Sequence, residues 1–333
     1  MVFSQIIVIF ALKREFRRLC APLFALINLS YRSLKMLIMK RLKFFIPFVS
    51  VLLLLCACGG SQDAAPAGEF GIRQLNDSSP DRDQMVLMET SMGNIKILLY
   101  KDAPLHRSNF VNLVKNGFYD GQLFFRVSEG FMIQAGDPMS RGAAKGTKLG
   151  TTEVSYNIPM EIDVPRRWHK RGALSAASLK PGISSSGCQF YIITGKKVFD
   201  RNLNAHEVKY NKTLRRLMYE SLQKPYADQI NKLYAESKKS AKKKRELNDM
   251  IHMFSEKTDS AMAGVKFEYS AEQRRHYKEV GGAFHLDGYY TVFGEVLEGI
   301  EIVEAISRVD YDVHERPIKD VVIKKVTLLD DED

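Results

Sequence analysis

The chain has 333 residues, of which 45% are hydrophobic and 10% aromatic, so it can bury a full core and is not a disordered protein. Its formal charge of +10 would suit a nucleic-acid binder, but residues 1–57 alone hold nine Lys and Arg against one acidic residue. The basicity belongs mostly to the start of the chain and is weak evidence for a nucleic-acid partner.

The first predicted element is an export signal. A basic stretch, KRLK at 40–43, precedes the apolar run FFIPFVSVLLLL at 44–55. This run has the length of a signal-peptide core and is too short for an ordinary membrane span. The arginines within 1–35 lie upstream of a complete signal, so we expect translation to start at Met36 or Met39.

A lipid anchor is predicted directly after the signal. The sequence LCAC at 55–58 resembles the bacterial lipoprotein box, in which the final cysteine, here Cys58, takes the lipid. We therefore expect residues 1–57 to be a leader and lipoprotein signal peptide, and the mature protein to be anchored in the bacterial cell envelope, facing the periplasm. A plain signal peptide or an anchor helix is the alternative.

After the anchor, residues 58–83 are rich in Gly, Ala, Ser, Asp and Pro, which predicts a flexible tether. Only Cys188 would remain in the folded body, so no disulfide is possible within one mature chain. It lies in the apolar run CQFYII without an accompanying His and acid pattern. We therefore favour a small buried side chain over a nucleophile.

The folded domain is predicted over residues 84–330. Two strand-like runs flank MGN at 92–94, which indicates a hairpin. The segment APLHRSNFVNLVKNG at 103–117 has its apolar residues on one helical face. Further strands are expected at 172–177, 189–194, 291–297 and 320–328, with a short helix in EGIEIVEAISR. Short strands and few helices favour a closed or sandwiched β fold.

Residues 196–281, here called the helical arm, differ from the rest of the domain. They have helical spacing and carry 20 basic and 12 acidic side chains. We expect a helical hairpin whose helices pack mainly on each other. Its Lys-rich run at 238–245 could bind nucleic acid or anionic lipid, but a solvated helix face is favoured.

Three blocks, FFRVSEGFMIQAGDP at 124–138, GCQFYIIT at 187–194 and HLDGYYTVFGEV at 285–296, closely resemble the cyclophilin family of peptidyl-prolyl cis-trans isomerases. The resemblance covers roughly residues 84–195 and 282–328. It implies a mainly β fold: a closed eight-stranded antiparallel barrel capped by two helices, with a proline-binding groove on its outside. The helical arm would interrupt this domain.

The resemblance implies that Arg126 is the catalytic residue. It implies substrate-binding residues in the three blocks and in ALSAASLKPG at 173–182, namely Phe131, Met132, Gln134, Ala177, Ser178, Gln189, Tyr191, His285, Leu286 and Tyr290. Four of these depart from common family residues: Ser178 replaces an Asn, Tyr191 a Phe, His285 a Trp and Tyr290 a His. Such changes weaken an expectation of tight cyclosporin binding more than one of isomerase activity.

An arginine suits this chemistry. Rotation about an X-Pro bond faces a barrier of about 18 to 20 kcal/mol. A guanidinium can hydrogen-bond the prolyl nitrogen as it becomes pyramidal in the twisted state, which the planar ground state does not allow. Arginine is planar, always charged and can be held by a neighbour such as Gln134. The alternative for Arg126 is a structural ion pair at the barrel rim.

These observations predict a peptidyl-prolyl isomerase that assists the folding of exported proteins. Its partners would be proline-containing unfolded or exported polypeptides and a membrane, without nucleic acid, and we expect a monomer. No cofactor is required, and the seven histidines show no ligand spacing that would indicate a metal site. The alternative function is a proline-peptide-binding or chaperone-like module with weak isomerase activity that acts through the helical arm.

Overall fold

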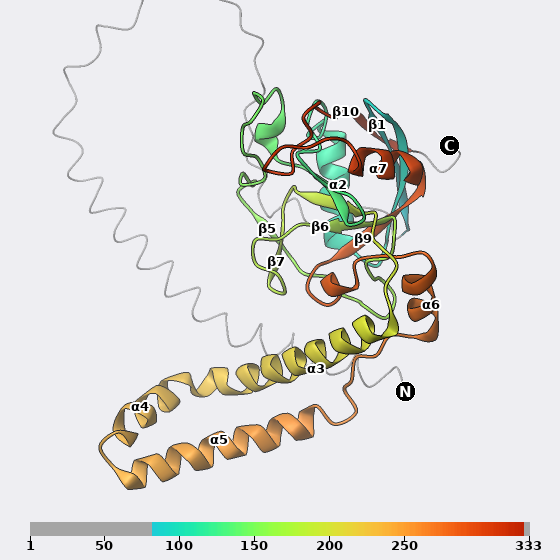
Figure 1. The fold of residues 1–333 in the computed structure, drawn as a ribbon. Coiled ribbons are helices and arrows are strands. Elements are labelled where there is room, and N and C mark those ends of the chain that lie inside the picture. Colours follow the sequence, from blue (N-terminus) through green and yellow to red (C-terminus); the bar gives the residue numbers. More distant parts are fainter. Residues whose placement is uncertain (1–81, 330–333) are drawn as a thin grey trace, which may run out of the picture. The chain divides into compact units, whose positions relative to one another are not determined.

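Alternating buried residues build the central sheet of the computed structural model, which describes residues 82–329 (Figure 1). In β1 (Gln84–Thr90) and β2 (Gly93–Leu99) every second side chain is fully buried in the core. The two strands pair as the predicted hairpin. The predicted leader, Cys58 and all but the last two residues of the tether lie outside the described residues.

Eight strands form one antiparallel sheet in the order β10-β1-β2-β9-β6-β8-β4-β3. The predicted strands are confirmed within a few residues. The remaining members of this sheet are β3 (Arg126–Ser128), β4 (Met132–Ala135), β6 (Ala173–Ala176), β8 (Phe190–Ile193), β9 (Val292–Glu298) and β10 (Ile323–Leu329). A separate two-stranded ladder joins β5 (Asn157–Pro159) to β7 (Ser184–Ser186).

The expectation of a closed barrel is wrong, because the curled sheet stays open between its edge strands β10 and β3. The chain just before β3 occupies the edge of β10 instead: Gly121 N–H donates to the Ile323 carbonyl at 2.7 Å and Phe124 N–H to the Val321 carbonyl at 2.9 Å. β3 itself has three residues and pairs only with β4. Individual backbone hydrogen bonds therefore join this segment to the edge of β10, and no continuous ladder forms between β3 and β10.

Two helices pack against the sheet. The helix α2 (Pro104–Lys115) begins at a proline, which suits the first helical turn, and contacts β9 and β10. Its predicted apolar face, with Phe110 and Leu113, is buried in the main core. The helix α7 (Ile300–Ser307) contacts β2 and β4 and buries Val303 in the same core.

The helical arm contains α3 (Asp200–Gln223), α4 (Ala227–Ser237), α5 (Ala241–Ala261) and α6 (Ala271–Glu279). Figure 1 shows α3 and α4 leading away from the sheet and α5 running back beside them. Pro225 lies in the 3₁₀ turn between α3 and α4. Within residues 82–329, no helix combines the length and the apolar character needed to cross a bilayer.

The expectation that the arm packs mainly on itself holds only for its outer part. The inner half of α3 and the chain from Phe267 to Tyr277 form an aromatic cluster with residues of the sheet-bearing part. This cluster, here called the root cluster, buries Val164, Leu203, Tyr210, Phe267, Tyr269 and Tyr277 and includes the partly buried Trp168, Phe284 and Tyr289. The arm supplies large aromatic side chains at its root, and these need an apolar partner surface.

Candidate active site

A groove of about 170 Å³ lies on the outer face of the sheet. Nine of the eleven residues predicted for the site line it: Arg126, Phe131, Met132, Gln134, Ala177, Ser178, Tyr191, Leu286 and Tyr290. The other two lie beside it. Gln189 hydrogen-bonds Gln134, and the His285 ring is centred 5.4 Å from the Phe131 ring.

Strand register explains why these side chains meet. Arg126 pairs with Gln134 across β3 and β4, and Gln134 pairs with Tyr191 across β4 and β8. Side chains directly opposite each other lie on the same face of a sheet. The neighbours Val127 and Ile133 point the other way and are fully buried in the core. One row of three residues on adjacent strands thus crosses the groove.

Arg126 is held by Glu315, a residue that the sequence analysis missed. Its Nε donates to Glu315 Oε2 at 2.5 Å, and the two side chains are 39% and 42% exposed. Gln134, which was expected to hold Arg126, has another partner through its amide nitrogen: Gln134 Nε2 donates to Gln189 Oε1 at 3.1 Å. Glu315 is 189 residues from Arg126 in the chain, and no local pattern identifies it.

Apolar and aromatic side chains form most of the rest of the groove, beside Gln134 and Ser178. Met132, Ala177 and Tyr191 are buried, and Leu286 packs on the cluster that they share. The Tyr290 ring meets the Tyr191 ring edge-on at a centroid distance of 6.1 Å. Such a concave apolar wall with few polar groups is typical of a small binding site.

Burial shifts the pKa of two groups at the groove. It lowers the pKa of His285, and the neighbouring His169 and His206 lower it further, so the ring is neutral at pH 7. Burial raises the pKa of Tyr290, against the opposing effect of the Arg126 charge. Both side chains are therefore uncharged beside Arg126, which is the cation among the groove-lining residues.

Ala177 and Ser178 already have partners within the protein. Ala177 N–H donates to the Gln189 carbonyl at 2.9 Å, and its carbonyl accepts from Ser186 N–H at 2.7 Å. The Ser178 hydroxyl donates to the Ser184 carbonyl at 2.5 Å. These bonds hold the edge of the groove in place.

Cys188 does not line the groove and is buried, as the sequence predicted. Burial, together with the nearby Glu153 charge, raises the pKa of its thiol to about 12. The thiolate that a nucleophile requires is therefore absent at neutral pH. Between residues 82 and 329, no group of three or more His, Cys, Asp and Glu side chains is arranged to hold a metal ion.

Comparison with curated proteins finds relatives that are described as peptidyl-prolyl cis-trans isomerases. The chain is 26% identical over 259 residues to a "putative peptidyl-prolyl cis-trans isomerase" of Staphylococcus haemolyticus, covering 77% of this chain and 97% of the relative. A protein of the same description from Staphylococcus epidermidis is 27% identical over 255 residues, covering 76% and 95%. A "putative bifunctional phosphatase/peptidyl-prolyl cis-trans isomerase" of Streptococcus pyogenes is 27% identical over 249 residues, 38% of its own length.

Among solved structures, a cyclophilin type peptidyl-prolyl cis-trans isomerase of Cryptosporidium parvum has 19% sequence identity and a TM-score of 0.43. The match covers 75% of this chain and 99% of that one. The family model described as "Cyclophilin type peptidyl-prolyl cis-trans isomerase/CLD" matches residues 85–212 and 228–328. Because this match spans well over half of the sequence, the chain belongs to the cyclophilin-type peptidyl-prolyl cis-trans isomerases.

Proposed function

We propose that the groove binds a proline-containing segment of an unfolded polypeptide and that Arg126 is the catalytic residue. The observation that carries this proposal is that one guanidinium lines the same groove of about 170 Å³ as the apolar side chains of Phe131, Met132 and Leu286. The pyrrolidine ring would lie against Phe131, Met132 and Leu286, and the amide nitrogen would face Arg126. Polypeptides with X-Pro bonds are therefore the substrates.

The guanidinium acts on the twisted amide. As the X-Pro bond rotates, conjugation is lost and the nitrogen lone pair becomes a hydrogen-bond acceptor. A donor that bonds this lone pair stabilises the transition state more than the planar ground state, which is the condition for catalysis. In the described part of the chain Glu315 bonds only Nε, so the terminal amino groups of Arg126 are free to reach the substrate.

The test is the substitution Arg126→Ala, assayed with a short proline peptide. We expect kcat/KM to fall at least about 100-fold, or about 2.7 kcal/mol, with kcat carrying the loss. The matched control is Arg215→Ala, which removes another half-exposed arginine from an ion pair, with Asp259 on α5. Equal rates for the parent protein and Arg126→Ala would exclude this mechanism.

The cellular setting is part of the proposal. A basic stretch, an apolar run of signal length and the lipobox-like LCAC support export and lipid attachment at Cys58. The enzyme would then be anchored in the cell envelope and would assist the folding of exported proteins. Cys58 lies outside the described residues, so this part of the proposal rests on sequence alone.

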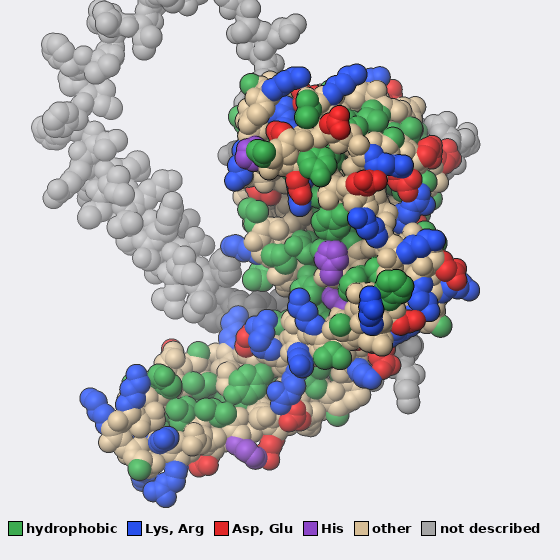
Figure 2. All heavy atoms as spheres, viewed as in Figure 1, with side chains coloured by type: hydrophobic (Ala, Val, Ile, Leu, Met, Phe, Trp, Pro, Cys, Tyr) green, Lys and Arg blue, Asp and Glu red, His purple; other side chains and the backbone are tan. Residues whose placement is uncertain are grey.

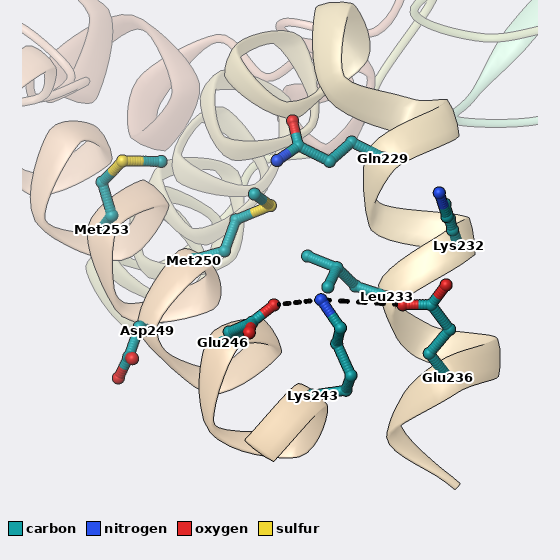
Figure 3. Close-up of a pocket in the computed structure, with 9 residues that line it drawn as sticks. All are labelled: Gln229, Lys232, Leu233, Glu236, Lys243, Glu246, Asp249, Met250 and Met253. Atoms are coloured by element: carbon teal, nitrogen blue, oxygen red, sulfur yellow. Dashed lines mark hydrogen bonds and ion pairs between the residues drawn. The ribbon is translucent and has the colours of Figure 1, made fainter. Parts of the chain in front are cut away.

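A second candidate function is client binding by the helical arm. A groove of about 660 Å³ lies between α4 and α5. Figure 3 shows Leu233 and Met250 pointing into it from opposite helices, while Lys243 forms ion pairs with Glu246 at 2.7 Å and Glu236 at 3.8 Å. Flexible Met side chains suit varied apolar partners.

Two substrates distinguish this candidate from simple catalysis. If the arm recruits clients, Met250→Lys would slow the catalysed refolding of a proline-limited protein while leaving the isomerisation of a short peptide unchanged. Met139→Lys, which alters an exposed methionine outside the arm, is the control. Equal refolding rates for Met250→Lys and the parent protein would remove this candidate.

A further inference from the structure

A chain of buried polar groups leads from the groove into the root of the helical arm. It starts at Tyr191, whose ring lines the groove and whose hydroxyl lies 3.1 Å from His169 Nε2. The other ring nitrogen, Nδ1, lies 2.8 Å from Asp287 Oδ1, which also accepts from the His169 backbone N–H at 2.8 Å. Tyr191 is 6% exposed, and His169 and Asp287 are each 1% exposed.

The arm completes this chain at its far end. Asp287 Oδ2 accepts from the Tyr277 hydroxyl of α6 at 2.6 Å and from the Tyr269 hydroxyl, just before α6, at 3.0 Å. Gly282 allows this approach, because a Cβ there would overlap the Tyr277 ring and the carbonyl oxygen of His169. Each carboxylate oxygen therefore has two groups within hydrogen-bond distance, and the arm supplies both of those at Oδ2. The Tyr269 hydroxyl shares its one proton with the Phe284 carbonyl at 3.1 Å, so Tyr277 is the main donor.

Hydrogen bonds take the place of an ion-pair partner from Lys or Arg. Within residues 82–329, no Lys or Arg side chain bonds the carboxylate of Asp287. A buried carboxylate is tolerated when its lone pairs are satisfied, so the loss of the tyrosine hydroxyls would leave Oδ2 unsatisfied. The position of Asp287 consequently depends on the folding of the arm root.

The Asp287 carboxylate also determines which atom donates in the hydrogen bond between His169 and Tyr191. His169 Nδ1 faces an acceptor and must carry a proton, so in the neutral ring Nε2 accepts a hydrogen bond from Tyr191. This bond holds the Tyr191 side chain at its hydroxyl, while the pairing of β8 holds its backbone. The wall of the groove is therefore ordered before a substrate binds.

We propose that His169 and Asp287 are positioning residues for the proline groove, and that Tyr269 and Tyr277 of the arm complete this support. The inference rests on the proposed function of the groove. It makes these two tyrosines at the root of the helical arm a working part of the isomerase site, even though no arm residue lines the groove.

The kinetic consequence differs from that of losing Arg126. A loosened Tyr191 ring must be ordered whenever a substrate binds, and the cost is the same in the ground state and the transition state. Such a change raises KM and leaves kcat unchanged, whereas loss of a contact made only in the transition state lowers kcat.

The experiment is a double-mutant cycle on the full-length protein, with Tyr277→Phe and Tyr191→Phe combined and separate. We expect Tyr277→Phe to raise KM about threefold or more at unchanged kcat, the size expected for ordering one side chain. In the Tyr191→Phe background, the same substitution should change KM no further. Tyr210→Phe, which removes a hydroxyl from the same root cluster without touching Asp287, should leave both constants unchanged.

Two outcomes would overturn the inference: additive effects of the two substitutions on KM, or a Tyr277→Phe protein that loses thermal stability at an unchanged KM. If Tyr277→Phe does not fold, Tyr269→Phe tests the same carboxylate oxygen. Arg126→Ala is measured in the same assay. If Arg126→Ala loses kcat as expected but Tyr191 and Tyr277 are not coupled, only the positioning role is rejected. If Arg126→Ala keeps its kcat, the catalytic role of Arg126 is rejected.

Discussion

Arg126 lies on a strand of three residues, and its orientation depends on a contact from a distant loop. The ion pair with Glu315 is half exposed, so its contribution to stability is small, about 0 to 1 kcal/mol. Glu315 has a φ of 61°, a conformation that few residues other than glycine adopt. Its carbonyl accepts from Val127 N–H at 2.9 Å, which holds the loop against β3. We infer that the pair orients the guanidinium more than it stabilises the fold.

At this scale we predict the effect of Glu315→Ala on turnover. The substitution frees the guanidinium to sample other positions, and we expect kcat to fall about two- to fivefold, in keeping with an exposed ion pair. KM should change little. Glu315→Gln retains an oxygen acceptor and the same backbone strain, so it should recover most of the lost rate. If Glu315→Ala and Glu315→Gln show the same kcat, the side chain does not orient Arg126.

At the scale of elements, the helical arm has two parts with different partners. Its outer part consists of the end of α3, α4 and most of α5, which contact one another. Its inner part belongs to the root cluster and supplies two hydroxyls to Asp287. The two parts meet where Arg215 reaches both Ser255 and Asp259. We therefore expect only the outer part to be separable from the groove.

Trimming the arm tests this division. Replacing residues 219–254 by a short Gly/Ser loop joins helices that already lie side by side, and loop length alters closure entropy only slowly. We expect this protein to fold and to isomerise a short peptide at the parent rate. Removal of 198–280 takes away the arm's side chains from the root cluster and should abolish folding or activity. The division is wrong if the shorter deletion is as damaging as the longer one.

The root cluster should also make stability depend on pH. Burial lowers the pKa of His206 below its ordinary value of 6.5, against the opposing charge of Asp287. The unfolded chain then binds more protons than the folded chain between the lowered pKa and pH 6.5. The free energy of unfolding should therefore fall as the pH drops below about 6.5.

The variant His206→Gln isolates this contribution in urea unfolding series at several pH values. Burial also lowers the pKa of His276 and His285, so these two residues preserve part of the dependence of stability on pH when His206 is replaced. We expect a smaller slope below pH 6.5 for His206→Gln and the parent slope for His252→Gln, whose side chain is 74% exposed. Identical slopes for all three proteins would contradict a neutral buried His206.

At the scale of the whole molecule, charge divides unevenly along the chain. The arm carries 20 basic and 12 acidic side chains, and Figure 2 shows Lys and Arg gathered at its far end. The side chains of Lys238, Lys239 and Lys242 are exposed there. This agrees with the solvated face favoured by the sequence. We therefore expect the proposed lipid site at Cys58, and not this basic end, to attach the protein to a membrane.

Cys58→Ser tests the anchor. Without the thiol the chain cannot be acylated, so we expect the protein to move from the membrane fraction to the soluble or unprocessed pool. Several acyl chains bind a membrane stably where a single chain does not, so the shift should be large. Cys188→Ser, at the buried cysteine, is the control and should leave fractionation unchanged. Persistent acylation of Cys58→Ser would exclude this site.

The sequence by itself determined the parts of the protein that local rules specify. Strand-like apolar runs located most of the strands, and the resemblance to the cyclophilin family singled out Arg126, Gln134 and Tyr191, which the strand pairing then places on one face. Only the tertiary structure decided the contacts that support these residues. Glu315 meets Arg126 across 189 residues of chain, and Asp287 meets His169 across 118. The opening between β3 and β10 likewise follows from the backbone hydrogen bonds that the segment just before β3 makes to the edge of β10. Such contacts join segments whose spacing carries no periodic signal, so their partners are chosen by packing and hydrogen-bond satisfaction in the folded chain.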